Sequence, residues 1–157
     1  MDVPSRPLPE PRDPDWEARV RRGFAGQPFM TLLGAALGRV EPGAVEIRLP
    51  IREALGQQHG FVHAGALWSI ADSAGGFAAQ SLMAPGEGVL TVELKINLLS
   101  PAHGESLRAI GRVERAGRRL TVGRSDVYAE EAEKAPRHVA TALGTFLAVS
   151  EDNTMRR

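Results

Sequence analysis

The spacing of apolar residues changes several times along this chain of 157 residues. Between residues 63 and 83 the spacing is helical, because apolar residues recur every three or four positions. This pattern predicts one long buried helix, and we expect the rest of the chain to be organised around it. The apolar side of this helix consists of Ala64, Leu67, Trp68, Ala71, Ala74, Gly75, Ala78 and Leu82, with Ser69, Ser73 and Gln80 on the opposite side.

A single carboxylate, Asp72, lies at the border of this apolar side. Its neighbours on the helix surface are small residues, so a ligand could approach it from one side. The adjacent pair Gly75-Gly76 costs the helix about 1 kcal/mol per residue relative to alanine. Close approach by a sheet or a second subunit would explain the pair. A tightly packed core helix with one solvent-facing aspartate is the alternative interpretation.

Two shorter helical patterns precede the long helix. Residues 15–26 carry Trp16, Val20 and Phe24 at helical spacing, and residues 29–33 add a further turn. Residues 1–14 contain five prolines among charged residues, which is typical of a flexible arm. We therefore expect a single domain over residues 15–150, with an N-terminal arm at 1–14 and a C-terminal tail at 151–157.

The remaining segments alternate between apolar and polar residues, which indicates strands. Over residues 90–98, leucine, valine and isoleucine alternate with Thr91, Glu93, Lys95 and Asn97, which predicts one face on the helix and one in water. The segments 51–62 and 130–137 lack a period and are expected to be loops. The other predicted strands are a hairpin at 36–50 and strands at 107–113, 119–129 and 139–149. This order predicts an α+β fold with an antiparallel sheet curled around one helix.

Composition excludes several kinds of site. The 19 basic and 19 acidic residues balance, so no charge excess argues for a nucleic-acid partner. The absence of cysteine excludes disulfides, thiolate metal sites and cysteine nucleophiles. No apolar run is long enough to span a membrane and no signal segment is evident, so we expect a soluble cytoplasmic protein with no membrane partner. The spacing of His59, His103 and His138 does not indicate a metal site.

Four features in register resemble the hotdog-fold thioesterases, specifically their PaaI-like branch. They are the loop and helix start Gln57-x-x-Gly60-x-x-His63-Ala64-Gly65, Asp72 nine positions after His63, the strand 91–97 and the turn 100–102. The likeness runs from about Gln57 to about Thr145. The family has His-Gly-Gly where this chain has His63-Ala64-Gly65. Ala64 retains the backbone N–H that the family uses, but its methyl group narrows the path of the thioester.

The resemblance implies an acyl-CoA thioesterase that hydrolyses an acyl- or aryl-acyl-coenzyme A without a metal or organic cofactor. Asp72 corresponds to the family's nucleophile or general base, and Gln57 to a residue that polarises the carbonyl or holds water. Thr91 corresponds to a residue that positions the water, and His63 to one that orients the loop. An oxyanion donor at the helix N-terminus is physically reasonable there, because its N–H groups are free and its dipole is positive. The donor would be the N–H of Ala64, helped by that of Gly65.

The resemblance also implies a homodimer with its sites at the interface. Ala64 and Asp72 lie about 12 Å apart along one helix, so both cannot serve one carbonyl from the same chain. In the family, the carboxylate comes from the partner's helix. A dimer of two such dimers is the alternative assembly. The residues expected to bind substrate are Gly60, Gly65, Trp68, Arg118 and Arg119.

Each of these residues also has a structural interpretation. His63 could hydrogen-bond its own backbone, Trp68 and Phe77 could belong to the core or line an acyl pocket, and Arg118 and Arg119 could be solvated instead of binding phosphates. Two other functions remain as alternatives. One is a non-catalytic acyl-CoA sensor, and the other is a hotdog dehydratase acting on acyl carrier protein.

Overall fold

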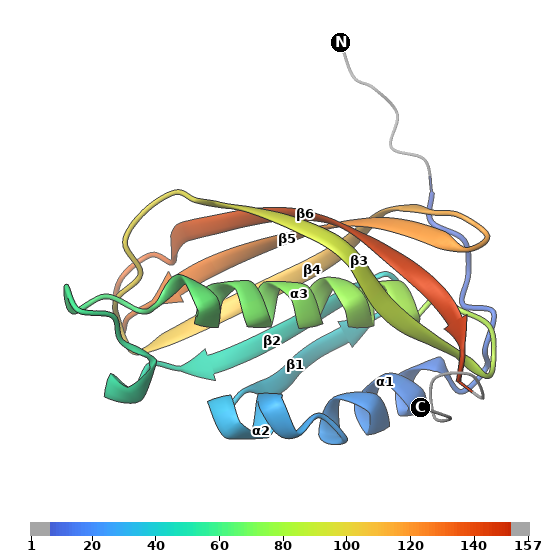
Figure 1. Ribbon diagram of the computed structural model, residues 1–157, viewed down its shortest axis with the longest axis horizontal. Helices are drawn as coiled ribbons and strands as arrows, with labels where there is room; N and C mark the ends of the chain where they lie inside the picture. The colour runs from blue at the N-terminus through green and yellow to red at the C-terminus, as the bar shows by residue number, and fades with distance from the viewer. Residues whose placement is uncertain (1–6, 152–157) are drawn as a thin grey trace, which may run out of the picture.

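A six-stranded antiparallel sheet wraps around one long helix (Figure 1). The computed structural model describes residues 7–151. The strands lie in the order β1-β2-β4-β5-β6-β3, and helix α3 crosses their concave face. This confirms the predicted α+β hotdog architecture. The strands are β1 (Ala36–Glu41), β2 (Ala44–Pro50), β3 (Glu87–Leu98), β4 (Ser106–Ala116), β5 (Leu120–Glu130) and β6 (Arg137–Ser150); the helices are α1 (Trp16–Ala25), α2 (Pro28–Leu33), the short 3-10 turn η1 (Glu53–Leu55) and α3 (Ala64–Gln80).

The sheet approaches α3 closely enough to require glycine. A Cβ atom added to Gly75 would lie 2.7 Å from Cζ of Phe146 on β6. A Cβ added to Gly111 on β4 would lie 2.3 Å from the backbone of Ala74. Close approach by the sheet therefore accounts for Gly75. Gly76 is not explained in this way, because a Cβ there would make ordinary contacts of 3.8 Å or more.

Helix α1 covers the side of α3 that the sequence pattern left polar. The rings of Phe24 and Phe77 meet edge to face, with centroids 5.9 Å apart. Ser73 and Gln80 are consequently buried, although both lie opposite the apolar residues on the helical wheel. Trp68, in contrast, is 39% exposed, so the interpretation of Trp68 as a core residue is wrong. Packing against α1, rather than the apolar period alone, decides which side of α3 is covered.

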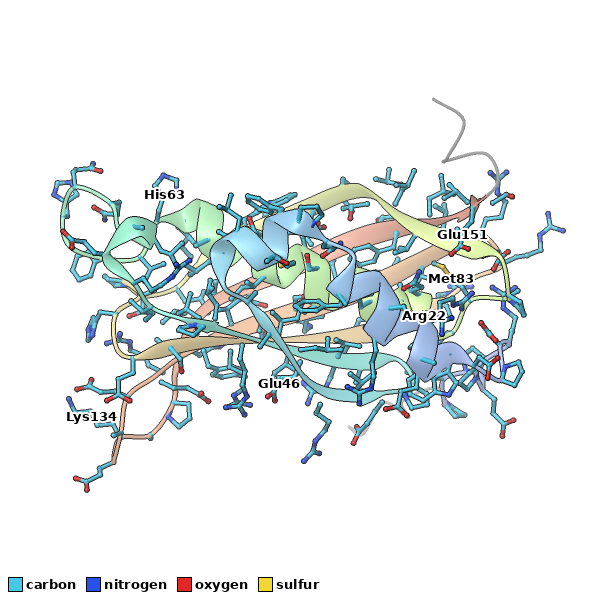
Figure 2. All side chains as sticks on the ribbon, turned by 90° about the horizontal axis from the view of Figure 1, so that it is seen from below. Arg22, Glu46, His63, Met83, Lys134 and Glu151 are labelled. Carbon is cyan, nitrogen blue, oxygen red and sulfur yellow. The ribbon has the colours of Figure 1, made fainter. Side chains whose placement is uncertain are left out.

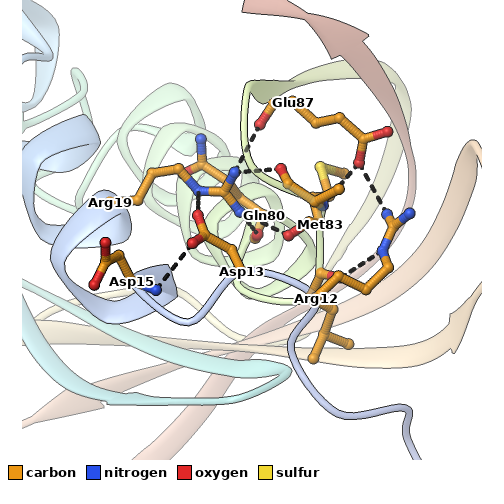
Figure 3. Close-up of polar contacts among 9 residues, drawn as sticks. Arg12, Asp13, Asp15, Arg19, Gln80, Met83 and Glu87 are labelled. Carbon is orange, nitrogen blue, oxygen red and sulfur yellow. Dashed lines mark hydrogen bonds and ion pairs between the residues drawn. The ribbon is translucent and has the colours of Figure 1, made fainter.

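A buried arginine fixes the C-terminal end of α3 (Figure 3). Arg19 of α1 donates hydrogen bonds to the carbonyl oxygens of Gln80, at 3.1 Å, and Met83, at 2.8 Å. Its Nε lies 3.3 Å from the carboxylate of Asp13, and Arg12 reaches the carbonyl of Leu82. A guanidinium at this position satisfies carbonyls that have no intrahelical partner. The inner part of the expected N-terminal arm is therefore held against the domain, whereas residues 1–6 and 152–157 of the arm and tail lie outside the described residues.

Strand β3 contains a bulge that shifts its alternation. Thr91 pairs with Phe146, but Glu93 pairs with Thr145, so Val92 is an extra residue between them. Because Phe146 faces α3, Thr91 faces α3 as well, and Leu90 is 50% exposed on the outer face. The expectation that Leu90 faces the helix is therefore wrong. Thr91 stays exposed, as expected, but its hydroxyl points toward α3 rather than away from it. A single inserted residue reverses which side chains point inward, and alternation alone does not reveal the insertion.

Candidate functional site

The loop before α3 presents the side-chain amide of Gln57. Gly60 has a φ of +83°, which glycine adopts without strain, and its N–H donates to the carbonyl of Gln57 at 3.0 Å. This turn brings the N–H of His59 to the side-chain oxygen of Gln57, which accepts a hydrogen bond from it. The NH2 group of Gln57 is therefore the end that remains for a ligand, and it can only donate.

His63 caps the N-terminus of α3. Its Nδ1 accepts a hydrogen bond from the N–H of Gly65 at 2.9 Å, so the ring has the local structural role that sequence analysis weighed as an alternative. The N–H of Gly65 is thereby occupied. No acceptor among residues 7–151 takes the N–H of Ala64. The backbone donor that remains free at this helix end is Ala64, and the helix dipole favours negative charge beside it.

These groups line one cavity of about 510 Å³ at the N-terminal end of α3. In Figure 2, His63 and Met83 mark the opposite ends of this helix. The loop and the helix start contribute most of the polar groups of the lining, together with the apolar Phe61 and Val62. The end of β3 and the segment that follows contribute mainly apolar side chains, with Ser100 as the exception. The lining residues are Gln57, Gln58, Phe61, Val62, His63, Ala64, Leu67, Leu98, Leu99, Ser100, Pro101 and Ala102. We call this space the amide cavity.

Asp72 lies in the middle of α3 and is held by Thr91. The hydroxyl Oγ1 of Thr91 donates to Oδ1 of Asp72 at 2.7 Å, which the bulge in β3 makes possible. Burial raises the pKa of the Asp72 carboxyl above its ordinary value, and the hydrogen bond from Thr91 opposes that rise. A carboxylate with a raised pKa is a stronger base than an exposed one.

Asp72 opens onto a different cavity, of about 370 Å³, between α3, β3 and the connection from α1 to α2. We call it the carboxylate cavity. Its lining residues are Gly23, Gln27, Asp72, Ser73, Gly76, Phe77, Gln80, Gly88, Val89, Leu90 and Thr91. Within one chain, the structure thus brings Gln57, His63 and Ala64 together in the amide cavity and Asp72 with Thr91 in the carboxylate cavity. It does not bring the two sets together.

The surface between the two cavities is open. Strand β3 pairs with β6 on one side and has no partner strand among the described residues on the other. Large apolar side chains are exposed along it, including Val92, Leu98 and Leu99. On α3, the exposed Trp68 lies one turn before Asp72. An unpaired strand edge beside exposed apolar residues is a surface on which another chain can pair.

The other predicted substrate-binding residues are scattered. Gly65 lines a third cavity, beside His63. Arg118 and Arg119 lie in the hairpin between β4 and β5, which is near the C-terminal end of α3. The backbone N–H of Val113, in the part of β4 that leads to this hairpin, donates to the carbonyl of Gly43. Gly43 in turn lies beside Leu82, two residues after α3. In one protomer, the two arginines are therefore at the opposite end of α3 from Ala64.

Two residues of the carboxylate cavity were not singled out by sequence analysis. The sequence pattern placed Gln80 only on the polar side of the helix. No sequence pattern indicated a functional role for Gln27, because tertiary packing alone brings it beside α3. Over residues 7–151, no cluster of three or more histidine, cysteine, aspartate or glutamate side chains could hold a metal ion. The same residues include no helix long and apolar enough to cross a membrane.

Comparisons with known proteins identify the family. The sequence model described as Thioesterase superfamily matches residues 59–135. A Halobacterium salinarum protein whose name gives it as a candidate esterase is 31% identical in an alignment 131 residues long, and the match covers 79% of this chain and 86% of that protein. The crystal structure of a thioesterase family protein from Silicibacter pomeroyi is 44% identical, has a TM-score of 0.84 and covers 86% of this chain and 98% of that one.

A more distant structure has the same fold. PaaI, from the phenylacetic acid degradation operon of Escherichia coli, has a TM-score of 0.77 at 18% identity and covers 88% of this chain and 96% of that one. The two matches above 30% identity, together with the shared fold, show that the chain belongs to the hotdog-fold thioesterase superfamily.

Proposed function

We propose that this protein is an acyl-CoA thioesterase, which hydrolyses the thioester of an acyl-coenzyme A to the free acid and coenzyme A. The observation that carries the proposal is the free N–H of Ala64 beside the donating amide of Gln57, together with a half-buried carboxylate held by a hydroxyl. The first pair suits a developing oxyanion, and the second suits a base or nucleophile.

In the proposed reaction, the thioester carbonyl oxygen accepts hydrogen bonds from the N–H of Ala64 and the NH2 of Gln57. Oδ2 of Asp72 is available for chemistry because Thr91 engages Oδ1. As a general base, Asp72 takes a proton from water while the water oxygen bonds to the carbonyl carbon. Collapse of the tetrahedral intermediate then breaks the carbon–sulfur bond, and the thiolate of coenzyme A takes up a proton. As a nucleophile, Asp72 would first form a mixed anhydride, which water then hydrolyses.

The site requires two copies of the chain in this proposal. Since the amide and carboxylate cavities are separate in one protomer, Asp72 of the partner subunit would act on a carbonyl held at Ala64. Pairing through the free edge of β3 and the exposed face of α3 would bury Val92 and Trp68. A two-fold axis perpendicular to α3 at this surface would make the two helices antiparallel and create two equivalent sites.

Coenzyme A would extend from the amide cavity along this interface. The apolar side chains of Leu67, Leu98 and Leu99 offer a surface for the thioester arm. In an antiparallel dimer, the hairpin carrying Arg118 and Arg119 of one protomer would lie near the amide cavity of the other, because each helix end lies beside the opposite end of the partner's helix. A guanidinium matches the geometry of phosphate oxygens, so we assign these two arginines to the phosphates of coenzyme A.

The test is the release of free thiol from a panel of short-chain, long-chain and aryl acyl-CoA esters. We expect turnover of at least one ester without added metal, and loss of that turnover in Asp72→Asn. Binding of the esters without thiol release would favour the acyl-CoA sensor instead. Absence of both binding and release would contradict both assignments.

A further inference from the structure

The carboxylate cavity continues along α3 beyond Asp72. Asp72, Gly76 and Gln80 are four residues apart, so they form one stripe on successive turns of the helix. The Cα atoms of the first and last are separated by about 12 Å at 1.5 Å per residue. Gly76 has no side chain to fill the space between them, and close approach by the sheet does not account for it. The cavity therefore runs from the carboxylate to an amide.

The walls of this cavity combine apolar and polar surface, and its far end is polar. Phe77, Val89 and Leu90 contribute apolar surface, whereas Gln27 and Gln80 contribute two amides. Gln80 is only 7% exposed. Its backbone is fixed because its carbonyl accepts from Arg19 at 3.1 Å (Figure 3). A buried side chain on a backbone held in this way is suited to discriminate between ligands.

The amide oxygens of both glutamines are buried without a hydrogen-bond partner among the described residues. Leaving a buried polar group unpaired costs about 1–3 kcal/mol. Two such groups from different elements, Gln80 from α3 and Gln27 from the residue before α2, line the same cavity as the carboxylate. The two side chains thus have hydrogen-bonding capacity that the protein itself does not use.

We propose that the carboxylate cavity is the acyl subsite and that Gln80 and Gln27 select acyl groups with a hydroxyl at their distal end. This inference rests on the proposed function, because the hydrolysis there places the thioester carbonyl beside Asp72. A hydroxyl both donates and accepts, so it can pair with a terminal amide in either orientation. A methyl group at the same place leaves both amides unpaired, and sites built to hydrogen-bond a hydroxyl discriminate strongly against analogues that lack it.

The test uses two coenzyme A thioethers, which cannot be hydrolysed: one with a six-carbon chain ending in a hydroxyl, the other with a methyl in place of the hydroxyl. We expect the wild-type protein to bind the hydroxyl analogue about tenfold more tightly or better, as one buried hydrogen bond would give. Gln80→Met and Gln27→Met should each reduce this ratio toward one, mainly by weakening binding of the hydroxyl analogue. Because each ratio compares two ligands on the same variant, a general loss of affinity cancels.

Equal binding of the two analogues by the wild-type protein would overturn the inference, as would a ratio unchanged in both variants. If Gln80→Met does not fold, as judged by thermal unfolding, Gln27→Met decides. Thiol release from the matching thioesters is measured in parallel. A hydroxyl preference without thiol release would reject the proposed hydrolysis and leave the proposed selectivity in place. Thiol release without a hydroxyl preference would reject the selectivity and leave the hydrolysis in place.

Discussion

The amide cavity and the carboxylate cavity are built in different ways. In the amide cavity, neighbours in sequence place the polar groups: the turn at Gly60 orients Gln57, and the cap by His63 leaves Ala64 as the free donor. In the carboxylate cavity, segments distant in sequence place them. Thr91 reaches Asp72 across 19 positions, and it does so only because Val92 is an extra residue in β3.

The difference separates two chemical tasks. Donors at a helix N-terminus are oriented before substrate arrives, which is the property that stabilises an oxyanion. The carboxylate instead depends on burial, which raises its pKa, and on one hydroxyl that opposes the rise. If the proposed function is correct, the two cavities contribute different steps, and variants in each should fail in different ways.

The largest effect is expected from the carboxylate. Asp72→Asn removes the base or nucleophile but keeps an oxygen that can accept from Thr91. We expect thiol release to fall by about 10² or more, with the fold retained. Steady-state kinetics and thermal unfolding of the same preparation measure both quantities. A rate equal to that of the wild-type protein would exclude Asp72 from the chemistry.

A comparable effect is expected when the backbone donor of the amide cavity is removed. Ala64→Pro deletes the N–H, and proline is tolerated at the first position of a helix. His63 already has a φ of −62° and a ψ of 137°, which a following proline allows. We expect kcat to fall by about 10²–10³, as for other lost oxyanion donors. Ala64→Gly, which keeps the N–H and removes the methyl, is the matched control and should retain activity; equal losses in both variants would count against this donor.

A smaller effect is expected from the hydroxyl that holds the carboxylate. Thr91→Val removes the hydrogen bond that lowers the pKa of Asp72, so that pKa should rise further. Since the deprotonated form is the active one, the acidic limb of the rate profile should move to higher pH, with a rate loss of about tenfold or less at neutral pH. Thr91→Ser keeps a donor and should leave the limb in place. If the acidic limb of the rate profile stays at the same pH in Thr91→Val, the hydrogen bond from Thr91 does not control the titration of Asp72.

The smallest effect is on stability. Because the pKa of Asp72 is raised in the folded protein, deprotonation destabilises the fold as pH rises above the ordinary value of 3.8 and through the folded value. Asp72→Asn should therefore unfold at a higher temperature than the wild-type protein at neutral pH. The difference should disappear as the pH approaches 3.8. The opposite result is that Asp72→Asn gains no stability over the wild-type protein between low pH and pH 7, or loses some. It would contradict the claim that burial raises the pKa of Asp72.

The sequence predicted the elements and residues of the amide cavity better than those of the carboxylate cavity. The helical period of residues 63–83 and the alternation of 36–50 are local signals, and the structure has α3 and the hairpin of β1 and β2 there. The resemblance to a family supplied Gln57, Ala64 and Asp72 as candidates. Alternation could not predict that Thr91 faces α3, because a bulge changes the phase without changing the residue types.

Tertiary contacts account for the rest. Gln80 and Ser73 look polar and exposed on a helical wheel, but α1 covers them. Trp68 looks like a core residue, but no described element covers it fully. Gln27 follows α1 and has no distinctive neighbours in the sequence. Such positions depend on how separate elements pack, which the period of a single segment does not contain.

The central claim is that one protomer supplies the donor and the other the carboxylate. The most direct measurement mixes Asp72→Asn with Ala64→Pro, each of which is expected alone to be about 10²-fold or more less active than the wild-type protein. The two variants carry different affinity tags and are unfolded and refolded together. Half of randomly formed dimers are mixed, and each mixed dimer has one intact site of two, so about a quarter of wild-type activity should return. Mixed dimers recovered through both tags that remain as inactive as either parent would contradict the account.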